Sequence, residues 1–116
     1  MVNIITSSRY KINKKKLAKI SDELLVEKGI LPDSTVNIVF VGKNKMKDVS
    51  KKYKQENVAL PVLSFKYNNK NQPYNDNLAG EIIICYPQAV LMAAKREKKV
   101  EDILIYLIDH AMENIA

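Results

Sequence analysis

The chain has 116 residues, 47% of them hydrophobic, a formal net charge of +6 and a single cysteine, Cys85, which excludes an internal disulfide. No stretch approaches the roughly 20 apolar residues of a membrane span, and the apolar residues at the N-terminus precede the basic ones, the wrong order for a secretory signal. We therefore expect one cytoplasmic domain that covers residues 1–116, buries a hydrophobic core and does not enter a membrane.

The first quarter of the chain predicts a short strand and a helix. Residues 2–6 form a brief apolar run, and residues 13–30 carry apolar side chains three and four positions apart, the spacing of one helix face. Asn13 can cap the start of this helix, and Gly29 follows its last turn, where glycine commonly ends a helix.

A second strand and a second helix are expected next. Residues 34–42 are rich in β-branched side chains and end at a glycine, which favours a strand. Residues 43–54 have an apolar face at helical spacing and lysines at many other positions. We expect Asn44 to cap this helix.

The second half of the chain predicts two more strands and then two helices. Residues 61–67 and 81–86 favour strands, and the polar, Asn-rich stretch 68–80 between them predicts a loop. The apolar run of the fourth strand indicates a place inside the sheet. Helices are expected over 87–97 and from about Val100 to the end. Together the elements predict an α/β (α+β) fold with a single mixed four-stranded sheet packed with helices.

Positive charge is concentrated in the first half of the chain. Residues 1–54 contain thirteen Lys and Arg against five Asp and Glu, whereas residues 55–116 contain six against eight. A basic half predicts a polyanion partner, and RNA is the first candidate. A lysine-rich surface that only keeps the protein in solution is the alternative. The candidate RNA-binding residues are Lys47, Lys51, Lys52 and Lys54.

His110 is the only histidine, and it lies four residues before Asn114 on the last predicted helix. Side chains at this spacing share a helix face, so two histidines placed this way can bind one metal ion. Asparagine at the second position is a poor zinc ligand, although hard cations accept its oxygen. Asp109 and Glu113 form a second such pair on a neighbouring face. A lone histidine on an apolar helix is more often structural, and Cys85 in an apolar strand is more often a buried small hydrophobe.

Segment order adds a further clue. The chain contains, in this order, the stretches VNIVFVGKNKMKDVSKKYK, VLSFKY, GEIIICYPQAV and ILIYLIDHAMENIA. In this order they resemble the YbeY family of rRNA-maturation endoribonucleases, over roughly residues 2–116. The most specific parts are Val62-Leu63-Ser64-Phe65 and Gly80-Glu81-Ile82-Ile83.

The resemblance implies a metal site and a phosphate contact. In the family, three histidines hold a metal ion taken to be zinc, with a position left open for water. By resemblance, His110 matches the first histidine, Asn114 stands where the second belongs, and the third would fall after Ala116. Lys54 matches a functional arginine of the family; it keeps the charge but loses the two-pronged hydrogen bonding of guanidinium.

By the same resemblance, the chain would be a zinc-dependent endoribonuclease of rRNA maturation and ribosome quality control, with an incomplete metal site. Its partner would be RNA, either rRNA or the small ribosomal subunit. Lys54 would be its catalytic contact to phosphate, and His110 and Asn114 would be its metal-binding positions.

Two other functions stay open from the residues themselves. The chain can be a non-catalytic RNA- or ribosome-binding module that uses its basic N-terminal half. It can also be a small interaction protein with a structural histidine and lysines that serve only solubility.

Overall fold

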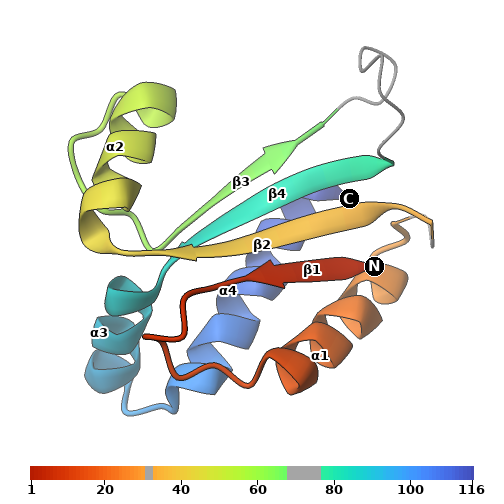
Figure 1. Ribbon diagram of the computed structural model, residues 1–116, viewed down its shortest axis with the longest axis horizontal. Helices are drawn as coiled ribbons and strands as arrows, with labels where there is room; N and C mark the ends of the chain where they lie inside the picture. The colour runs from red at the N-terminus through yellow and green to blue at the C-terminus, as the bar shows by residue number, and fades with distance from the viewer. Residues whose placement is uncertain (31–32, 68–76) are drawn as a thin grey trace.

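The computed structural model describes residues 1–30, 33–67 and 77–116. Its four strands form one mixed sheet in the order β1-β2-β4-β3, with β3 antiparallel to β4 and the other neighbours parallel (Figure 1). The predicted fold class is therefore confirmed, as is the internal position of the fourth strand. No helix in the described ranges is long and apolar enough to span a membrane. The elements are β1 (Val2–Ile5), α1 (Lys14–Glu27), β2 (Thr35–Val41), α2 (Lys43–Lys54), β3 (Val62–Lys66), β4 (Leu78–Cys85), α3 (Tyr86–Arg96) and α4 (Val100–Ile115).

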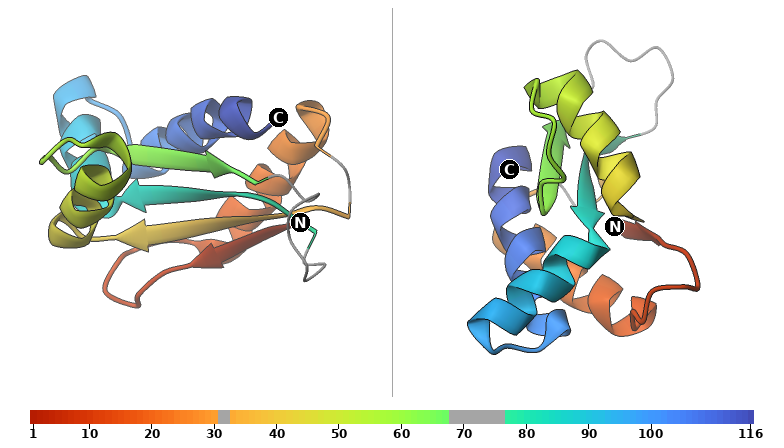
Figure 2. Two further views of the ribbon diagram at one scale, coloured as in Figure 1. Left: turned by 90° about the horizontal axis from the view of Figure 1, so that it is seen from above. Right: turned by 90° about the vertical axis from the view of Figure 1, so that its left-hand side faces the viewer.

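The helices divide unequally between the two faces of the sheet (Figure 2). The main core lies between one face and the helices α1, α3 and α4, and it contains Ile38, Ile82 and Ile108, all fully buried. On the opposite face, α2 covers a smaller cluster that includes Met46 and Cys85. Cys85 is thus a buried small hydrophobe, as predicted, and burial raises the pKa of its thiol. Strand alternation decides which side chains meet which helix.

Local signals at the helix ends are partly confirmed. The Asn13 side chain accepts a hydrogen bond from the backbone N–H of Lys16 at 3.1 Å, as the predicted cap requires. Gly29 has a φ of 75°, the left-handed conformation that glycine adopts without strain. The predicted cap at Asn44 is wrong, because α2 begins at Lys43. β2 ends one residue before Gly42, which therefore takes the cap position itself.

The start of β4 is the second difference from the predicted elements. β4 begins at Leu78, within the stretch expected to be a loop, and residues 68–76 of that stretch lie outside the described residues. Leu78 and Gly80 pair with the start of β2. Pairing with a neighbouring strand thus extends β4 beyond what its polar local sequence favours.

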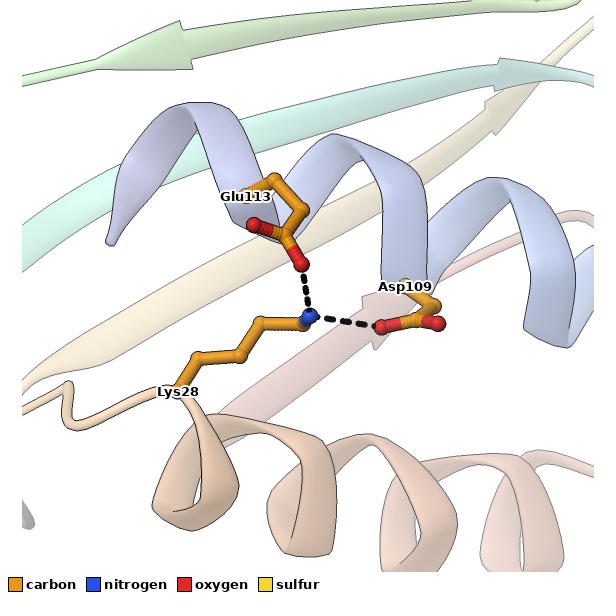
Figure 3. Close-up of polar contacts among 3 residues, drawn as sticks. All are labelled: Lys28, Asp109 and Glu113. Atoms are coloured by element: carbon orange, nitrogen blue, oxygen red, sulfur yellow. Dashed lines mark hydrogen bonds and ion pairs between the residues drawn. The ribbon is translucent and has the colours of Figure 1, made fainter.

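A lysine joins the end of α1 to the second half of α4 (Figure 3). The Nζ atom of Lys28 lies 2.7 Å from a carboxylate oxygen of Asp109 and 2.6 Å from one of Glu113. These are the two acids that the sequence places four residues apart on α4. Hydrogen bonds to Asp109 and then to Glu113 raise the pKa of the Lys28 ammonium group. The contact fixes how α4 is turned relative to α1.

We expect Lys28→Met to lower the melting temperature at pH 7. Because the pKa of Lys28 is raised in the folded state, its contribution is complete below the ordinary lysine pKa and disappears as pH rises through the folded value. The difference from wild type should therefore shrink at strongly alkaline pH, and also at high salt, because both carboxylates are exposed. Thermal unfolding at several pH values measures this. Lys19→Met, which changes an exposed lysine within α1, is the control, and equal shifts in both variants would rule out a specific contact.

Candidate functional site

A groove of about 440 Å³ runs between α4 and the edge strand β3. It brings His110 and Asn114 of α4 together with Lys54, the last residue of α2. These three residues are the predicted catalytic and metal-binding positions, and 55 residues of the sequence separate Lys54 from His110. Apolar side chains and Ser64 of β3 form part of the wall, and Glu56 lies in the connection after α2.

His110 lies at the border of the buried face of α4, not within it. Ile108 and Ala111 are buried against the sheet, whereas the His110 side chain is exposed. One residue turns an α-helix by about 100°, so His110 points away from the core that its apolar neighbours enter. Although the helix is apolar, its histidine is thus not part of the core, and the imidazole is available to a molecule in the groove.

Asn114 links the end of α4 to β3. Its side-chain nitrogen donates a hydrogen bond to the Ser64 hydroxyl at 2.9 Å and also lies 3.5 Å from the Ser64 carbonyl oxygen. The amide is thereby held against the strand, one helical turn after His110. This contact ties α4 to β3 at the wall of the groove, and a metal-binding role for Asn114 stays a prediction.

Ser64 was missed as a site residue. Alternation along β3 puts Leu63 and Phe65 in the cluster under α2 and leaves Ser64 facing α4. The pattern of one polar residue between two apolar ones was visible in the sequence, but its meaning depended on which helix covers that face.

An exposed aromatic residue extends the site along α4. Tyr106 is 50% exposed, and its ring lies nearly parallel to that of His110, at 14° and with centroids 6.4 Å apart. The guanidinium of Arg96 lies 5.5 Å from the Tyr106 ring centroid. Tyr106, His110 and Asn114 follow at intervals of four residues, a spacing that could have identified Tyr106 as part of the same face.

The four lysines of the predicted cluster do not all line one pocket in the described structure. Of its four members, Lys54 lines the groove in the described structure, and Lys52 lines a separate pocket under α2. Lys47 and Lys51 are exposed on α2. Lys47, Lys51 and Lys54 follow at intervals of four and three residues and share one face of α2. Lys52 is turned by about 100° from Lys51 and lies on another side of the helix.

Comparison with known proteins decides the family. The sequence profile described as Endoribonuclease YbeY matches residues 3–113. The chain belongs to the YbeY family. The resemblance predicted from the sequence is thereby confirmed over nearly all of the chain.

Individual relatives agree with this assignment. The Endoribonuclease YbeY of Dehalococcoides mccartyi (strain CBDB1) is 31% identical over 125 residues, which cover 96% of this chain and 75% of that protein. The Endoribonuclease YbeY of Thermodesulfovibrio yellowstonii is 36% identical over 95 residues, covering 82% of this chain and 55% of that protein. The solution structure of TM1509 from Thermotoga maritima has the same fold, with a TM-score of 0.66 at 17% identity, covering 97% of this chain and 69% of that one.

The zinc ion that the YbeY resemblance implies does not fit the groove as described. A catalytic zinc site has three protein ligands, usually imidazole, thiolate or carboxylate. Here His110 supplies one imidazole, and Asn114 supplies an amide that is bound to Ser64. Asp109 and Glu113 are turned toward Lys28 (Figure 3). Within residues 1–30, 33–67 and 77–116, no three His, Cys, Asp or Glu side chains gather closely enough to hold a metal ion.

Proposed function

We propose that this YbeY-family chain acts on RNA as an endoribonuclease of rRNA maturation, with the groove between α4 and β3 as its site. The observation that carries the proposal is the meeting of Lys54 and His110 in one groove, although they come from distant parts of the chain. The names of the relatives, Endoribonuclease YbeY, support the same activity.

The side chains of the groove can perform two tasks in phosphodiester cleavage, which are to transfer protons and to offset negative charge on the phosphate. In hydrolysis, a water oxygen bonds to phosphorus, one P–O ester bond breaks, and a proton passes to the leaving oxygen. Histidine is the side chain best suited to exchange protons near neutral pH, and His110 is exposed to the groove. The Lys54 ammonium group can offset the negative charge that develops on the phosphate oxygens. Asn114 and Ser64 keep the two walls in register.

The surface around the groove favours a single strand over a duplex. Unpaired bases stack on exposed aromatic rings and arginine planes, and Arg96 at the end of α3 together with Tyr106 and His110 of α4 offers both. Lys47 and Lys51 are proposed as further phosphate contacts on α2, and Lys52 as an RNA contact at the separate pocket that it lines. The partner would be rRNA or the small ribosomal subunit, and the setting a cytoplasmic, single-domain protein.

Zinc is part of the proposal only as a recruited ion. His110 would be its one strong ligand from the described residues, and two further strong ligands would have to come from elsewhere. The cleavage assay below therefore includes added zinc and a chelator as separate arms.

Cleavage of a short, 5′-labelled single-stranded RNA tests the proposal. We expect wild type to cut the RNA and His110→Ala to lose roughly 100-fold or more of the rate, the usual effect of removing a group that transfers protons or binds the catalytic ion. Lys54→Ala should also slow cleavage, whereas Lys98→Ala, at the opposite end of α4, should not.

Two outcomes would contradict the endoribonuclease. Cleavage that survives His110→Ala would come from another nuclease in the sample. Tight, salt-dependent RNA binding without cleavage in any arm would replace the enzyme by the RNA-binding module that the sequence left open.

A further inference from the structure

A second pocket lies on the other face of the sheet, between α2 and the strands β3 and β4. Its volume is about 430 Å³. Pockets that hold small molecules usually measure roughly 300–1,000 Å³. Its described lining shares no residue with the groove that contains His110. The pocket is therefore a separate place for a ligand.

Aromatic side chains supply much of the lining. The rings of Tyr53 and Phe65 meet edge to face, with centroids 5.0 Å apart, and Tyr53 is nevertheless 55% exposed. The Lys52 ammonium group lies 5.3 Å from the Tyr53 ring centroid. An exposed ring beside a lysine is the arrangement on which unpaired nucleic-acid bases stack.

A fixed carboxylate supplies the polar part of the pocket. The Tyr67 hydroxyl donates a hydrogen bond to Glu81 at 2.7 Å. Burial and this contact raise the pKa of Tyr67 to about 12, so its hydroxyl stays protonated and keeps donating near neutral pH. A carboxylate accepts several hydrogen bonds and donates none. A ligand that reaches Glu81 must therefore bring N–H or O–H donors.

The charges of the pocket select against a bare phosphate. Lys45 and Lys52 are matched by Asp48 and Glu81, so the described residues of the lining carry no excess positive charge. An anion would gain little from two lysines that are balanced by two acids. A flat, neutral ligand with N–H donors suits both the rings and the carboxylate.

We propose that this pocket binds a nucleobase of the RNA and prefers guanine. The N1–H and N2–H₂ groups of guanine place two donors side by side for Glu81. Uracil instead offers a single N–H group that lies between two carbonyl oxygens. The negative charge of a carboxylate repels both of these oxygens. This inference rests on the proposed function, because the base would belong to the RNA whose backbone lies in the groove.

Neighbouring residues of the chain connect the pocket under α2 to the groove that contains His110. On α2, Tyr53 lines the pocket and the next residue, Lys54, lines the groove. On β3, Phe65 lines the pocket and its neighbour Ser64 lines the groove. β3 is an edge strand of the sheet, and the contact between the Tyr53 and Phe65 rings brings the end of α2 to this edge. An RNA strand that passes this edge meets the groove on one side and the pocket on the other.

Titration of the whole chain with guanosine 5′-monophosphate and with uridine 5′-monophosphate tests the inference by ¹H–¹⁵N NMR. For wild type we expect shifts of the Tyr67 and Glu81 amides and a Kd about tenfold lower for the guanine nucleotide, as hydrogen bonds to one base edge usually provide. Glu81→Gln keeps the size of the side chain and should abolish the preference. Tyr53→Leu should weaken binding of both nucleotides, whereas Tyr53→Phe should retain it.

Equal affinity for the two nucleotides, a preference that survives Glu81→Gln, or shifts confined to the region of His110 would overturn the inference. The titration requires neither RNA cleavage nor an occupied groove. RNA cleavage without guanine binding would thus refute this pocket and leave the proposed function intact. Guanine binding in the pocket without any RNA cleavage would support the pocket and count against the endoribonuclease.

Discussion

Lys54→Glu is expected to weaken binding of a short single-stranded RNA about tenfold at 0.1 M salt. Lys54 lies in the groove beside His110, where the RNA backbone is proposed to pass. One phosphate contact to a single strand contributes a slope of about 0.7 in the dependence of log affinity on log salt. At this salt concentration, such a contact makes the binding constant roughly fivefold larger than it would be without the contact. Reversing the charge adds repulsion to that loss. Fluorescence anisotropy at a series of salt concentrations measures both the affinity and the slope.

Matched variants separate a local contact from a general effect of net charge. Lys98→Glu changes the net charge equally but lies before the first turn of α4, at the end far from His110. It should have little effect on affinity. Lys54→Arg should bind at least as well as wild type, because guanidinium can make two parallel bonds to a phosphate. Equal losses for Lys54→Glu and Lys98→Glu would mean that the groove does not contact the RNA backbone.

Gly80→Ala is expected to lower the free energy of unfolding by about 1–3 kcal/mol, the usual cost of an added methyl group in a packed site. A Cβ atom at this position would lie 2.5 Å from the Phe65 carbonyl oxygen and 2.9 Å from the Ile115 side chain. The first neighbour is backbone of β3, paired with β4, and it cannot move without disturbing the strand. Chemical denaturation measures the loss.

Gly42→Ala is the control for this substitution. A Cβ atom there meets only the Tyr10 hydroxyl, at 3.4 Å, among the described atoms within 4 Å. The gain from a less flexible unfolded chain and the poorer helix cap should nearly cancel, for a net change of roughly 0.5 kcal/mol or less. A Gly80→Ala variant as stable as wild type would show that β3 and the end of α4 do not press on β4 here. In Gly80→Ala, the added methyl group would displace β3 and the end of α4 and so shift Asn114 relative to Ser64. RNA affinity should therefore fall together with stability.

The fold follows from the sequence because its signals are local and repeated. Apolar spacing identified each helix of α1 to α4, and β-branched runs identified the strands, including the internal β4. The errors fall where local and tertiary preferences compete. Asn44 favours a cap, but β2 leaves only Gly42 before α2 begins. Leu78 follows a polar stretch, but pairing with β2 draws it into β4.

The candidate site was predictable only in part. Spacing on the last helix paired His110 with Asn114, the family resemblance joined Lys54 to them, and the structure brings all three to one groove. Charge counts alone grouped Lys54 with Lys52, which lines the other pocket, and with two further lysines of α2 that line neither one in the described structure. Ser64 and the pocket under α2 depend on which strand faces meet which helices. That information lies in the sheet order β1-β2-β4-β3, which no short stretch of sequence contains.

RNA is proposed to bind in the groove between α4 and β3. Mapping of NMR chemical-shift changes on addition of RNA is the direct test of this binding site. A uniformly ¹⁵N-labelled chain is titrated with a short single-stranded RNA that is chemically blocked against cleavage. If RNA binds in the groove, we expect the largest chemical-shift changes at the backbone amides of Lys54, Ser64 and His110 and at the side-chain amide of Asn114. Shifts that leave these signals unchanged and fall on the lysines of α1 would contradict it.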